Sequence, residues 1–424
     1  MNVLNKTYSE ELDSKDSLAK YRKEFHIPVI AGKETLYFTG NSLGLMPRLA
    51  EKYIAEELED WKKWGVEGHL HARRPWMPYH EFFSKSLAKI VGGKPEEVVV
   101  MGSLTNNLHL LMVSFFRPKG KRTKILCEAK AFPSDQYALA SQLRFHGLEP
   151  SEHLIEIGPR HGEHHIHQED IRSALDQHGD QIAMMMIGGV NYYTGQVMDM
   201  KTLTAHAQSK GIIVGWDLAH GAGNVELQLH DWNVDFAAWC HYKYINSGPG
   251  ATAGYFIHER HHGQSEIPRF EGWWGHDKET RFKMPDTFKP IPTAEAWQLS
   301  NAPIMAMAPL RASLDLFEQA GFHNLRTKSE KLTAYLQEVL EFIAIETASN
   351  FEIITPRKDR GAQLSLLVHG YGKPLFDHLT AQGVIADWRE PNVIRMAPVP
   401  LYNSFEDVRA FGQILMNYLN TNKP

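Results

Sequence analysis

The sequence has few of the features that mark secreted, membrane-bound or nucleic-acid-binding proteins. Its two cysteines, Cys127 and Cys240, cannot form a disulfide framework, so we expect a reducing, cytoplasmic environment. The polar N-terminus, MNVLNKTYSEELDSKD, has no signal-peptide core, and the most apolar runs, LHLLMVSFF and IAMMMIGGV, are too short to span a bilayer. A formal net charge of -5 offers no basic surface. We therefore expect neither nucleic acid nor a membrane as a partner.

The central part of the chain alternates between apolar and amphipathic segments. The predicted strands are EVVVM, TKILCEA, HLIEI, QIAMMMIGG, IIVGWD and DFAAWC. Helical spacing is found in residues 104–116, 133–147, 169–179 and 199–211. Strands that are apolar almost throughout and alternate with helices indicate a parallel sheet covered on both faces, which is an α/β fold. Upstream, residues 49–64 predict a helix that stops at Gly65.

The last third has a different pattern. Strand-like segments occupy residues 351–355, 363–370, 384–389 and 392–397, with a helix at 373–383. A final helix is predicted to open at Ser404, because Asp407 three residues later completes a capping-box pattern. We expect three parts: residues 1–70 as an N-terminal segment with helices joining the small domain, 71–302 as a large α/β domain, and 303–424 as a small α+β domain.

Ligands of open α/β sheets bind beyond the carboxyl ends of the strands, and polar or aromatic residues follow four of the predicted strands. The turn GSLTNN places hydroxyl groups at a helix N-terminus, which suits an anion or simply caps the helix. Phe132 suits ring stacking or the core. Asp217 is a carboxylate that needs a cationic partner if buried, or begins a turn. Lys243 follows DFAAWC among aromatic residues.

Together these four features predict a site for pyridoxal 5'-phosphate. Lysine forms a Schiff base with its aldehyde, a carboxylate pairs with its pyridinium nitrogen, a helix N-terminus binds its phosphate, and an aromatic ring stacks on it. Aromatic surroundings favour the neutral, nucleophilic form of Lys243. Each feature alone has a purely structural explanation, but their occurrence at separate strand ends of one sheet favours the cofactor.

Longer segments resemble the kynureninases, a family of pyridoxal-phosphate enzymes with the aspartate-aminotransferase fold (fold type I). The segments that carry the resemblance are YFTGNSLGLMPR, GSLTNNLHLLMVSFF, EAKAFPSDQYA, NYYTGQ, DLAHGAGNVELQLHDWNVDFAAWCHYKYINSGPG, GWWGHD, RFKM, QLSNAPI and IRMAPVPLYNSF. The resemblance implies a large pyridoxal-phosphate domain built on a mostly parallel sheet covered by helices, a smaller α+β domain, and a homodimer with shared active sites.

The resemblance also implies roles for individual residues. Cofactor-binding positions are Leu104, Thr105, Phe132, Ser134, Asp135, Asp217, His220, Tyr242, Lys243, Trp273 and Asn301, of which Trp273 and Asn301 usually come from the partner subunit. Lys243 matches the Schiff-base lysine, and Tyr242 and His220 are further catalytic candidates. Arg395 matches the arginine that binds the substrate α-carboxylate, and His69 falls where the substrate ring is approached. Gly188 stands where the family often has serine, so a hydroxyl group toward the cofactor is missing.

The activity that the resemblance implies is hydrolysis of the Cβ–Cγ bond of L-kynurenine or 3-hydroxy-L-kynurenine, in tryptophan catabolism or NAD biosynthesis. An aminotransferase remains an alternative within the same cofactor class. A cysteine desulfurase needs a nucleophilic cysteine after the Schiff-base lysine, and the chain has none beyond Cys240.

A zinc hydrolase is the alternative from another class. Residues His258 to His262 fit the pattern H-E-x-x-H, which binds zinc only on a helix, yet here it follows a predicted strand and runs into Gly263. A second cluster, HGEHHIHQ, lies in a predicted loop. We therefore interpret the first as a polar strand exit and the second as a solvated loop, and expect no metal site.

Overall fold

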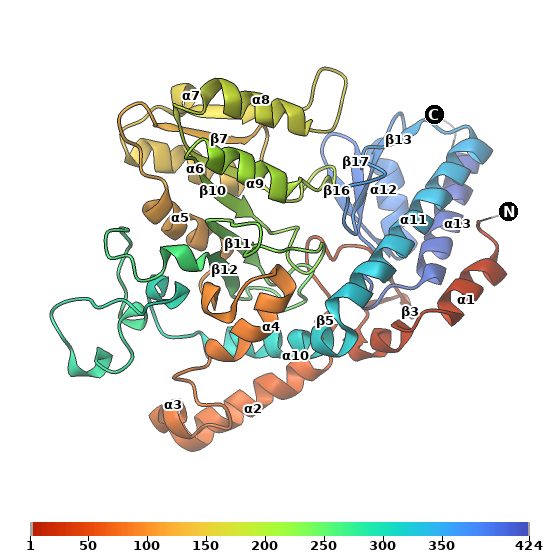
Figure 1. Ribbon diagram of the computed structural model, residues 1–424. Helices are drawn as coiled ribbons and strands as arrows, with labels where there is room; N and C mark the ends of the chain where they lie inside the picture. The colour runs from red at the N-terminus through yellow and green to blue at the C-terminus, as the bar shows by residue number, and fades with distance from the viewer. Residues whose placement is uncertain (1–2, 423–424) are drawn as a thin grey trace.

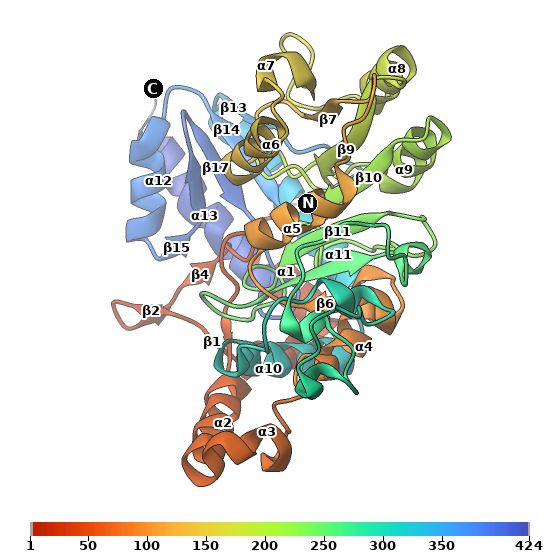
Figure 2. The same ribbon diagram turned by 90° about the vertical axis from the view of Figure 1, so that its left-hand side faces the viewer.

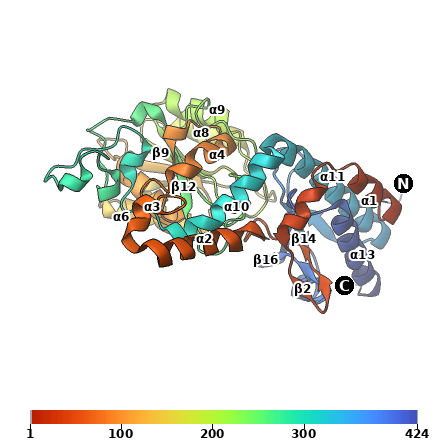
Figure 3. The same ribbon diagram turned by 90° about the horizontal axis from the view of Figure 1, so that it is seen from below.

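The computed structural model describes residues 3–422, which form two lobes (Figures 1 and 3). The large lobe is built on a seven-stranded sheet of order β6-β12-β11-β10-β9-β7-β8. Its strands are β6 (Val98–Val100), β7 (Lys124–Glu128), β8 (Leu154–Ile157), β9 (Ile182–Gly188), β10 (Ile213–Asp217), β11 (Phe236–Cys240) and β12 (Ala253–Ile257). Neighbouring strands from β11 to β8 are parallel, whereas β12 is antiparallel to both β11 and β6. The sheet is therefore mostly parallel, as predicted.

Helices cover both faces of this sheet (Figure 2). On one side lie α5 (Leu104–Phe115) and α6 (Pro133–Phe145), and on the other α8 (Gln168–His178) and α9 (Met200–Ser209). Strand β11 shows the consequence for the sequence, since Phe236 and Ala238 belong to the core under α5 and α6, while Ala237 and Trp239 belong to the opposite core. Both faces of a central strand are thus buried, which is why it is apolar throughout.

The small lobe holds an antiparallel sheet of order β13-β14-β17-β16. Its elements are β13 (Phe351–Ile353), β14 (Leu364–Val368), β16 (Asp387–Arg389), β17 (Val393–Met396), α11 (Phe322–Thr347), α12 (Gly372–Ala381) and α13 (Phe405–Thr421). Helix α13 begins with the predicted capping box, in which Ser404 Oγ accepts the N–H of Asp407 at 3.0 Å. In return, the Asp407 carboxylate accepts the N–H of Ser404 at 3.1 Å.

The N-terminal segment connects the two lobes. Helix α1 (Lys6–Ser14) packs on α13, and β4 (Leu36–Tyr37) pairs in parallel with β15 (Val384–Ile385). Helix α2 (Leu49–Trp64) packs on α10 (Ile304–Ala320) and ends at Gly65, whose φ of +52° matches the predicted stop. The remaining elements are α3 (Gly68–His71), α4 (Glu81–Val91), α7 (Pro150–His153), β1 (Phe25–His26), β2 (Val29–Ile30), β3 (Lys33–Glu34) and β5 (Met46–Pro47). The three-part division of the chain remains a proposal.

Charged side chains of the N-terminal segment bind it to the small lobe. The carboxylate of Asp13 accepts the N–H groups of Phe405 and Glu406 at the start of α13, at 2.8 and 3.0 Å. Lys328 of α11 and Asp16 form a buried ion pair at 2.7 Å. Within residues 3–422, no helix is both long and apolar enough to cross a membrane.

Candidate active site

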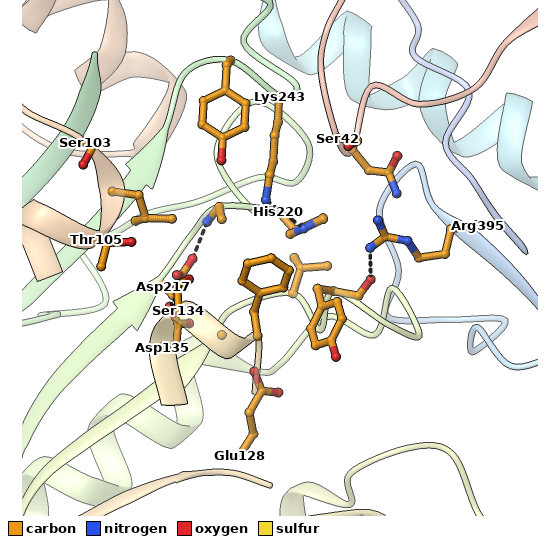
Figure 4. A pocket seen from close by; sticks show the side chains of 18 of the residues that line it. Ser42, Ser103, Thr105, Glu128, Ser134, Asp135, Asp217, His220, Lys243 and Arg395 are labelled. Carbon is orange, nitrogen blue, oxygen red and sulfur yellow. Dashed lines mark hydrogen bonds between the residues drawn. The ribbon is translucent and has the colours of Figure 1, made fainter. Parts of the chain in front are cut away.

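A cavity of about 290 Å³ lies at the carboxyl ends of the parallel strands, where the large sheet faces β16 and β17. Many of the residues predicted from the sequence line it, namely Leu104, Thr105, Phe132, Ser134, Asp135, Asp217, His220, Tyr242, Lys243 and Arg395. In Figure 4, Thr105 lies at one end and Arg395 at the other, with Asp217, His220 and Lys243 between them. The cavity therefore offers anion-binding groups at both ends and a primary amine in the middle.

The loop that carries Lys243 is firmly held. It follows β11 directly, and the fully buried His241 ring bonds through Nδ1 to the carbonyl oxygen of Thr252 at 2.7 Å. Gly44 of the N-terminal segment packs against the same loop, where its N–H donates to the carbonyl of Tyr242 at 2.8 Å. The lysine side chain therefore projects from a fixed backbone rather than from a mobile loop.

The amine of Lys243 faces a neutral imidazole. Its Nζ lies 3.1 Å from Nε2 of His220 and 5.9 Å from the centroid of the Phe132 ring. Burial and the nearby lysine charge hold the pKa of His220 well below its ordinary value, so the ring carries no charge at neutral pH. A neutral His220 can accept a proton from a neighbouring group.

Two carboxyl groups meet beneath the centre of the cavity. Asp217 ends β10, is 7% exposed, and accepts the N–H of Ala219 at 2.6 Å. Burial raises its pKa, and burial together with the charge of Asp217 raises the pKa of Asp135 much further. Asp135 therefore keeps its proton and donates it to the Asp217 carboxylate. Lys243 is the cation that acts on both, so the pair is short of positive charge.

The turn between β6 and α5 presents unpaired groups to the cavity. Gly102 takes the left-handed conformation, with φ of +55°, and so turns the chain sharply into the helix. Ser103 stands at the N-cap but makes no side-chain cap, so its hydroxyl group and the first N–H groups of α5 stay available. With the hydroxyl group of Thr105, they make a site suited to an anion.

Phe132 exposes its ring to the same cavity from the start of α6. It is 39% exposed, and its edge contacts Tyr192 at 5.3 Å between ring centroids. An exposed aromatic ring that lines a cavity is a platform for a flat ligand.

Arg395 closes the other end of the cavity from β17. It is 1% exposed, its Nη1 donates to the carbonyl of Tyr192 at 2.6 Å, and its Nη2 pairs with Asp387 at 2.5 Å. Its Nε has no hydrogen-bond partner among residues 3–422, whereas the neighbouring Arg389 is paired with Asp387 through Nε and Nη2, both at 3.2 Å. A guanidinium group with an unused donor at Arg395, beside a second one at Arg389, suits a carboxylate ligand.

Three predicted residues lie outside the cavity. Trp273, which is 46% exposed, and Asn301 stand on the surface. His69 lies in α3, where Nδ1 bonds to the carbonyl of Val66 at 2.9 Å and the ring contacts Trp76. The chain does not bring these residues to its own site, and their roles stay predictions.

The sequence analysis did not single out several residues that line the cavity: Asn41, Ser42, Glu128, Val190, Tyr192 and Arg389. Tyr192 lies shortly after the predicted strand QIAMMMIGG, and Glu128 lies near the end of the predicted strand TKILCEA, so the strand-end rule could have found both. Asn41 and Ser42 come from the N-terminal segment, where no strand-end pattern marks them, although they lie in the segment YFTGNSLGLMPR that carries the family resemblance.

Hydrogen bonds account for both histidine-rich motifs. His258 precedes a single turn of 3₁₀ helix, residues Glu259–His261, so the H-E-x-x-H pattern is a polar strand exit, as predicted. Its last histidine, His262, bonds to the carbonyl of Ile257 at 3.0 Å. In the second motif, which lies outside any helix until Gln168, His165 bonds to the carbonyl of Ile354 at 2.8 Å. The motif thus connects the large lobe to the edge of the small sheet.

The chain is similar to known proteins over nearly its whole length. A family model described as the kynureninase C-terminal domain matches residues 325–415. The curated kynureninase of Christiangramia forsetii is 57% identical over 410 residues, covering 96% of each chain. That of Myxococcus xanthus is 54% identical, covering 97% of this chain and 96% of the relative. That of the animal Nematostella vectensis is 46% identical, covering 100% of this chain and 96% of the relative.

Solved structures share the fold at low identity. A cysteine desulfurase from Thermococcus onnurineus superposes with a TM-score of 0.75 at 19% identity, covering 95% of this chain and 98% of its own. The cystine C–S lyase C-DES, solved with cysteine persulfide, gives a TM-score of 0.75 at 17% identity, covering 90% and 97%. These likenesses establish the predicted fold class.

Proposed function

The chain belongs to the kynureninase family, and from this premise we propose that its cavity binds pyridoxal 5'-phosphate and hydrolyses the Cβ–Cγ bond of L-kynurenine or its 3-hydroxy form. The products are anthranilate or 3-hydroxyanthranilate and L-alanine, which places the reaction in tryptophan catabolism and NAD biosynthesis. The observation that carries the proposal is the approach of Lys243 Nζ to His220 Nε2 at 3.1 Å, inside a cavity that also presents Asp217 and Phe132.

The residues present fit this cofactor. The pair Asp135 and Asp217 lacks positive charge, and a protonated ring nitrogen against Asp217 would supply it. The uncapped start of α5 at Leu104 and Thr105 would hold the phosphate, and Ser134 lines the same cavity. Phe132 would stack on the ring.

When bound, the cofactor supplies an aldehyde that bonds to an amine and a cationic ring that withdraws electrons from the substrate Cα. Lys243 would hold the cofactor through its amine, and as a free amine it would take the proton from the substrate Cα. Asp217 keeps the proton on the ring nitrogen, and Arg395 fixes the α-carboxylate. These residues set the carbon to be deprotonated next to the base.

Two residues beside Lys243 serve the hydrolytic step. Burial raises the pKa of Tyr242, so its phenol keeps its proton and can donate it to the ketone oxygen at Cγ. The neutral His220 can accept a proton from the attacking water. Hydration of the ketone then lets the Cβ–Cγ bond break, with the aryl carboxylate leaving and Cβ taking up a proton to give alanine.

The central test is the change Lys243→Ala. The variant should release no fluorescent anthranilate from kynurenine, and borohydride reduction of the unmodified holoenzyme should leave a pyridoxyl group on Lys243 in peptide mass mapping. Lys130→Ala is the matched control, since this exposed lysine lies two residues before Phe132 outside the cavity. Near-normal turnover by Lys243→Ala, or a tag on another lysine, would show that the assignment is wrong.

The chain shares its fold with cysteine desulfurases, but it does not have the residues for desulfurase activity. The chain has only Cys127 and Cys240, and both are buried in strands of the large sheet. A desulfurase needs a thiol that can reach its substrate. An aminotransferase would leave the cofactor in its amine form and would need a keto-acid acceptor, so anthranilate release without added keto acid separates the two activities.

We also propose that the protein is a cytoplasmic homodimer whose sites take Trp273 and Asn301 from the partner subunit, and that His69 approaches the substrate ring. The surface position of Trp273 and Asn301, away from their own cavity, supports this arrangement. Mixing Lys243→Ala subunits with Trp273→Ala subunits should restore about a quarter to a half of the activity, because hybrid dimers hold one intact site. A monomer in light scattering, or no recovery in hybrids shown to form, would contradict the proposal.

A further inference from the structure

The carboxyl group of Glu128 is a part of the cavity that the reaction described above does not use. Glu128 is the last residue of β7, is 4% exposed, and lines the cavity in Figure 4. Its Oε2 accepts the side-chain N–H of Asn191 at 3.0 Å, and the backbone N–H of Gly188 donates to the same carboxyl group. No salt bridge to Glu128 occurs within residues 3–422, so its two neutral partners hold it.

Gly188 and Glu128 fit each other closely at the ends of adjacent strands. A Cβ at position 188 would lie 2.9 Å from Oε1 of Glu128, which is nearer than Cβ atoms come to other heavy atoms. The carboxyl group therefore occupies the space that a side chain at position 188 would take. The missing hydroxyl group noted at Gly188 is thus matched by a carboxyl group from the neighbouring strand.

The side-chain amide of Asn191 connects Glu128 to the turn formed by residues 191–194. While its Nδ2 donates to Glu128, its Oδ1 accepts the N–H of Tyr193 at 3.0 Å, and the N–H and hydroxyl group of Thr194 at 2.9 and 3.1 Å. One amide group thus joins Glu128 to the backbone of residues 191–194.

The carbonyl groups of this turn hold the small sheet. The carbonyl of Tyr192 accepts Nη1 of Arg395 at 2.6 Å and Nε2 of Gln363 at 3.1 Å. The carbonyl of Tyr193 accepts the hydroxyl group of Ser365 at 2.6 Å. The substrate-binding arginine of the small lobe is therefore oriented by a turn of the large lobe.

We propose that Glu128 is a positioning residue that, through Asn191 and the carbonyl of Tyr192, sets the orientation of Arg395 toward the substrate α-carboxylate, and does so more firmly when ionised. An ionised carboxylate accepts a stronger hydrogen bond from the Asn191 amide than a neutral carboxyl group does. The inference rests on the proposed function, because it assigns the carboxylate of an amino acid to Arg395.

The charge of Glu128 changes within the working pH range. Burial raises its pKa to about 7, and the charge of Asp217 on β10 adds to the effect, opposed by the bond from Asn191. The other titratable groups that interact with it are Asp135 on α6, Tyr192 on the turn, and Cys127 on its own strand. The hold on Arg395 should therefore tighten as the pH rises through about 7.

The test uses the holoenzyme variants Glu128→Gln and Glu128→Ala, with Glu156→Gln on the neighbouring strand β8 as an exposed control. Glutamine keeps an acceptor for Asn191 but cannot ionise. Relative to the unmodified enzyme at each pH, it should have equal KM for kynurenine below pH 7 and a higher KM above it. Alanine should raise KM about tenfold at pH 8 with kcat within about threefold, because a hydrogen bond to a charged group is lost.

Two further measurements separate this inference from the proposed function. Gly188→Ala displaces the carboxyl group and should raise KM as Glu128→Ala does. In the protein without cofactor, the unfolding midpoint should fall as the pH rises from 5 to 8, and should fall less in Glu128→Gln, because a raised folded-state pKa costs stability on ionisation. The inference would be overturned if the enzymes cleave kynurenine but the ratio of KM between Glu128→Gln and the unmodified enzyme does not change with pH. It would also be overturned if the unfolding midpoint of Glu128→Gln depends on pH as that of the unmodified protein does. Loss of cleavage in every protein, unmodified enzyme included, would overturn the proposed function.

Discussion

Replacing Asp217 by asparagine should have opposite effects on the protein without cofactor and on cofactor binding. Without cofactor, Asp217 is a buried carboxyl group beside Asp135, and burial raises the pKa of both. Asparagine has the same shape, can still accept the N–H of Ala219 and can donate to Asp135. Removal of this buried charge should stabilise the cofactor-free protein by about 1–2 kcal/mol near pH 8. This stabilisation should be smaller at lower pH. A carboxyl group with a raised folded-state pKa lowers the stability of the protein only as the pH rises and the group ionises.

Cofactor affinity should change in the other direction. The hydrogen bond between Asp217 and a protonated ring nitrogen involves two charged groups, and such a bond contributes about 1.5–3 kcal/mol. Its loss corresponds to about 10- to 150-fold weaker binding. Urea unfolding of the cofactor-free protein measures the first effect, and the absorbance of bound cofactor after dialysis measures the second. Asp231→Asn, at an exposed aspartate of the same lobe, is the control.

The reasoning fails if Asp217→Asn destabilises the cofactor-free protein while Asp231→Asn does not, since the buried carboxyl group would then be a net source of stability. It fails equally if the cofactor binds the variant as tightly as the unmodified protein. Only the second result would separate Asp217 from the ring nitrogen.

Three further changes test the framework around the site. Gly44→Ala would push a Cβ into the carbonyl of Lys243, so urea unfolding should show a loss of about 1–3 kcal/mol, and an unchanged midpoint would contradict that close approach. Lys328→Met should cost about 3–5 kcal/mol by leaving buried Asp16 unpaired, and adding Asp16→Asn should recover part of it; a double variant no better than the single one would count against this. Ser404→Ala should lower stability by about 0.5–2 kcal/mol, and thermal unfolding without a shift would show that the capping box contributes little.

Much of the large lobe could be predicted because its strands are buried on both faces. In β11, Phe236 and Trp239 contribute to different cores. Because both faces of the strand are buried, its residues form a continuous apolar run in the sequence. The direction of β12 could not be read in the same way. An antiparallel strand between β11 and β6 is as apolar as its neighbours, and only the helix-free connection of residues 241–252 indicates that the chain turns back.

Some residues of the candidate site could likewise be predicted from local sequence patterns, and others could not. Asp217 and Lys243 come directly after predicted strands, so the strand-end rule finds them from local pattern alone. Asn41 follows the two-residue strand β4, which pairs with β15 across nearly 350 positions of the chain, and Arg389 belongs to β16, which pairs with β17. Both reach the cavity through contacts between distant parts of the chain. Such short pairings depend on tertiary contacts and leave no periodic signal in the sequence.

The pairing of β4 with β15 also sets the order of events during synthesis. Leu36 pairs with Val384, and Thr39 bridges to Ala397. Strand β4 therefore has no partner until residues 384–397 have left the ribosome. The strands of the large sheet, from β6 to β12, emerge well before that and can fold as a unit. The segment that holds Asn41 and Ser42 can make all of its contacts only after this pairing has formed. A nascent chain stalled short of residue 384 would therefore carry a folded large sheet but an incomplete pocket.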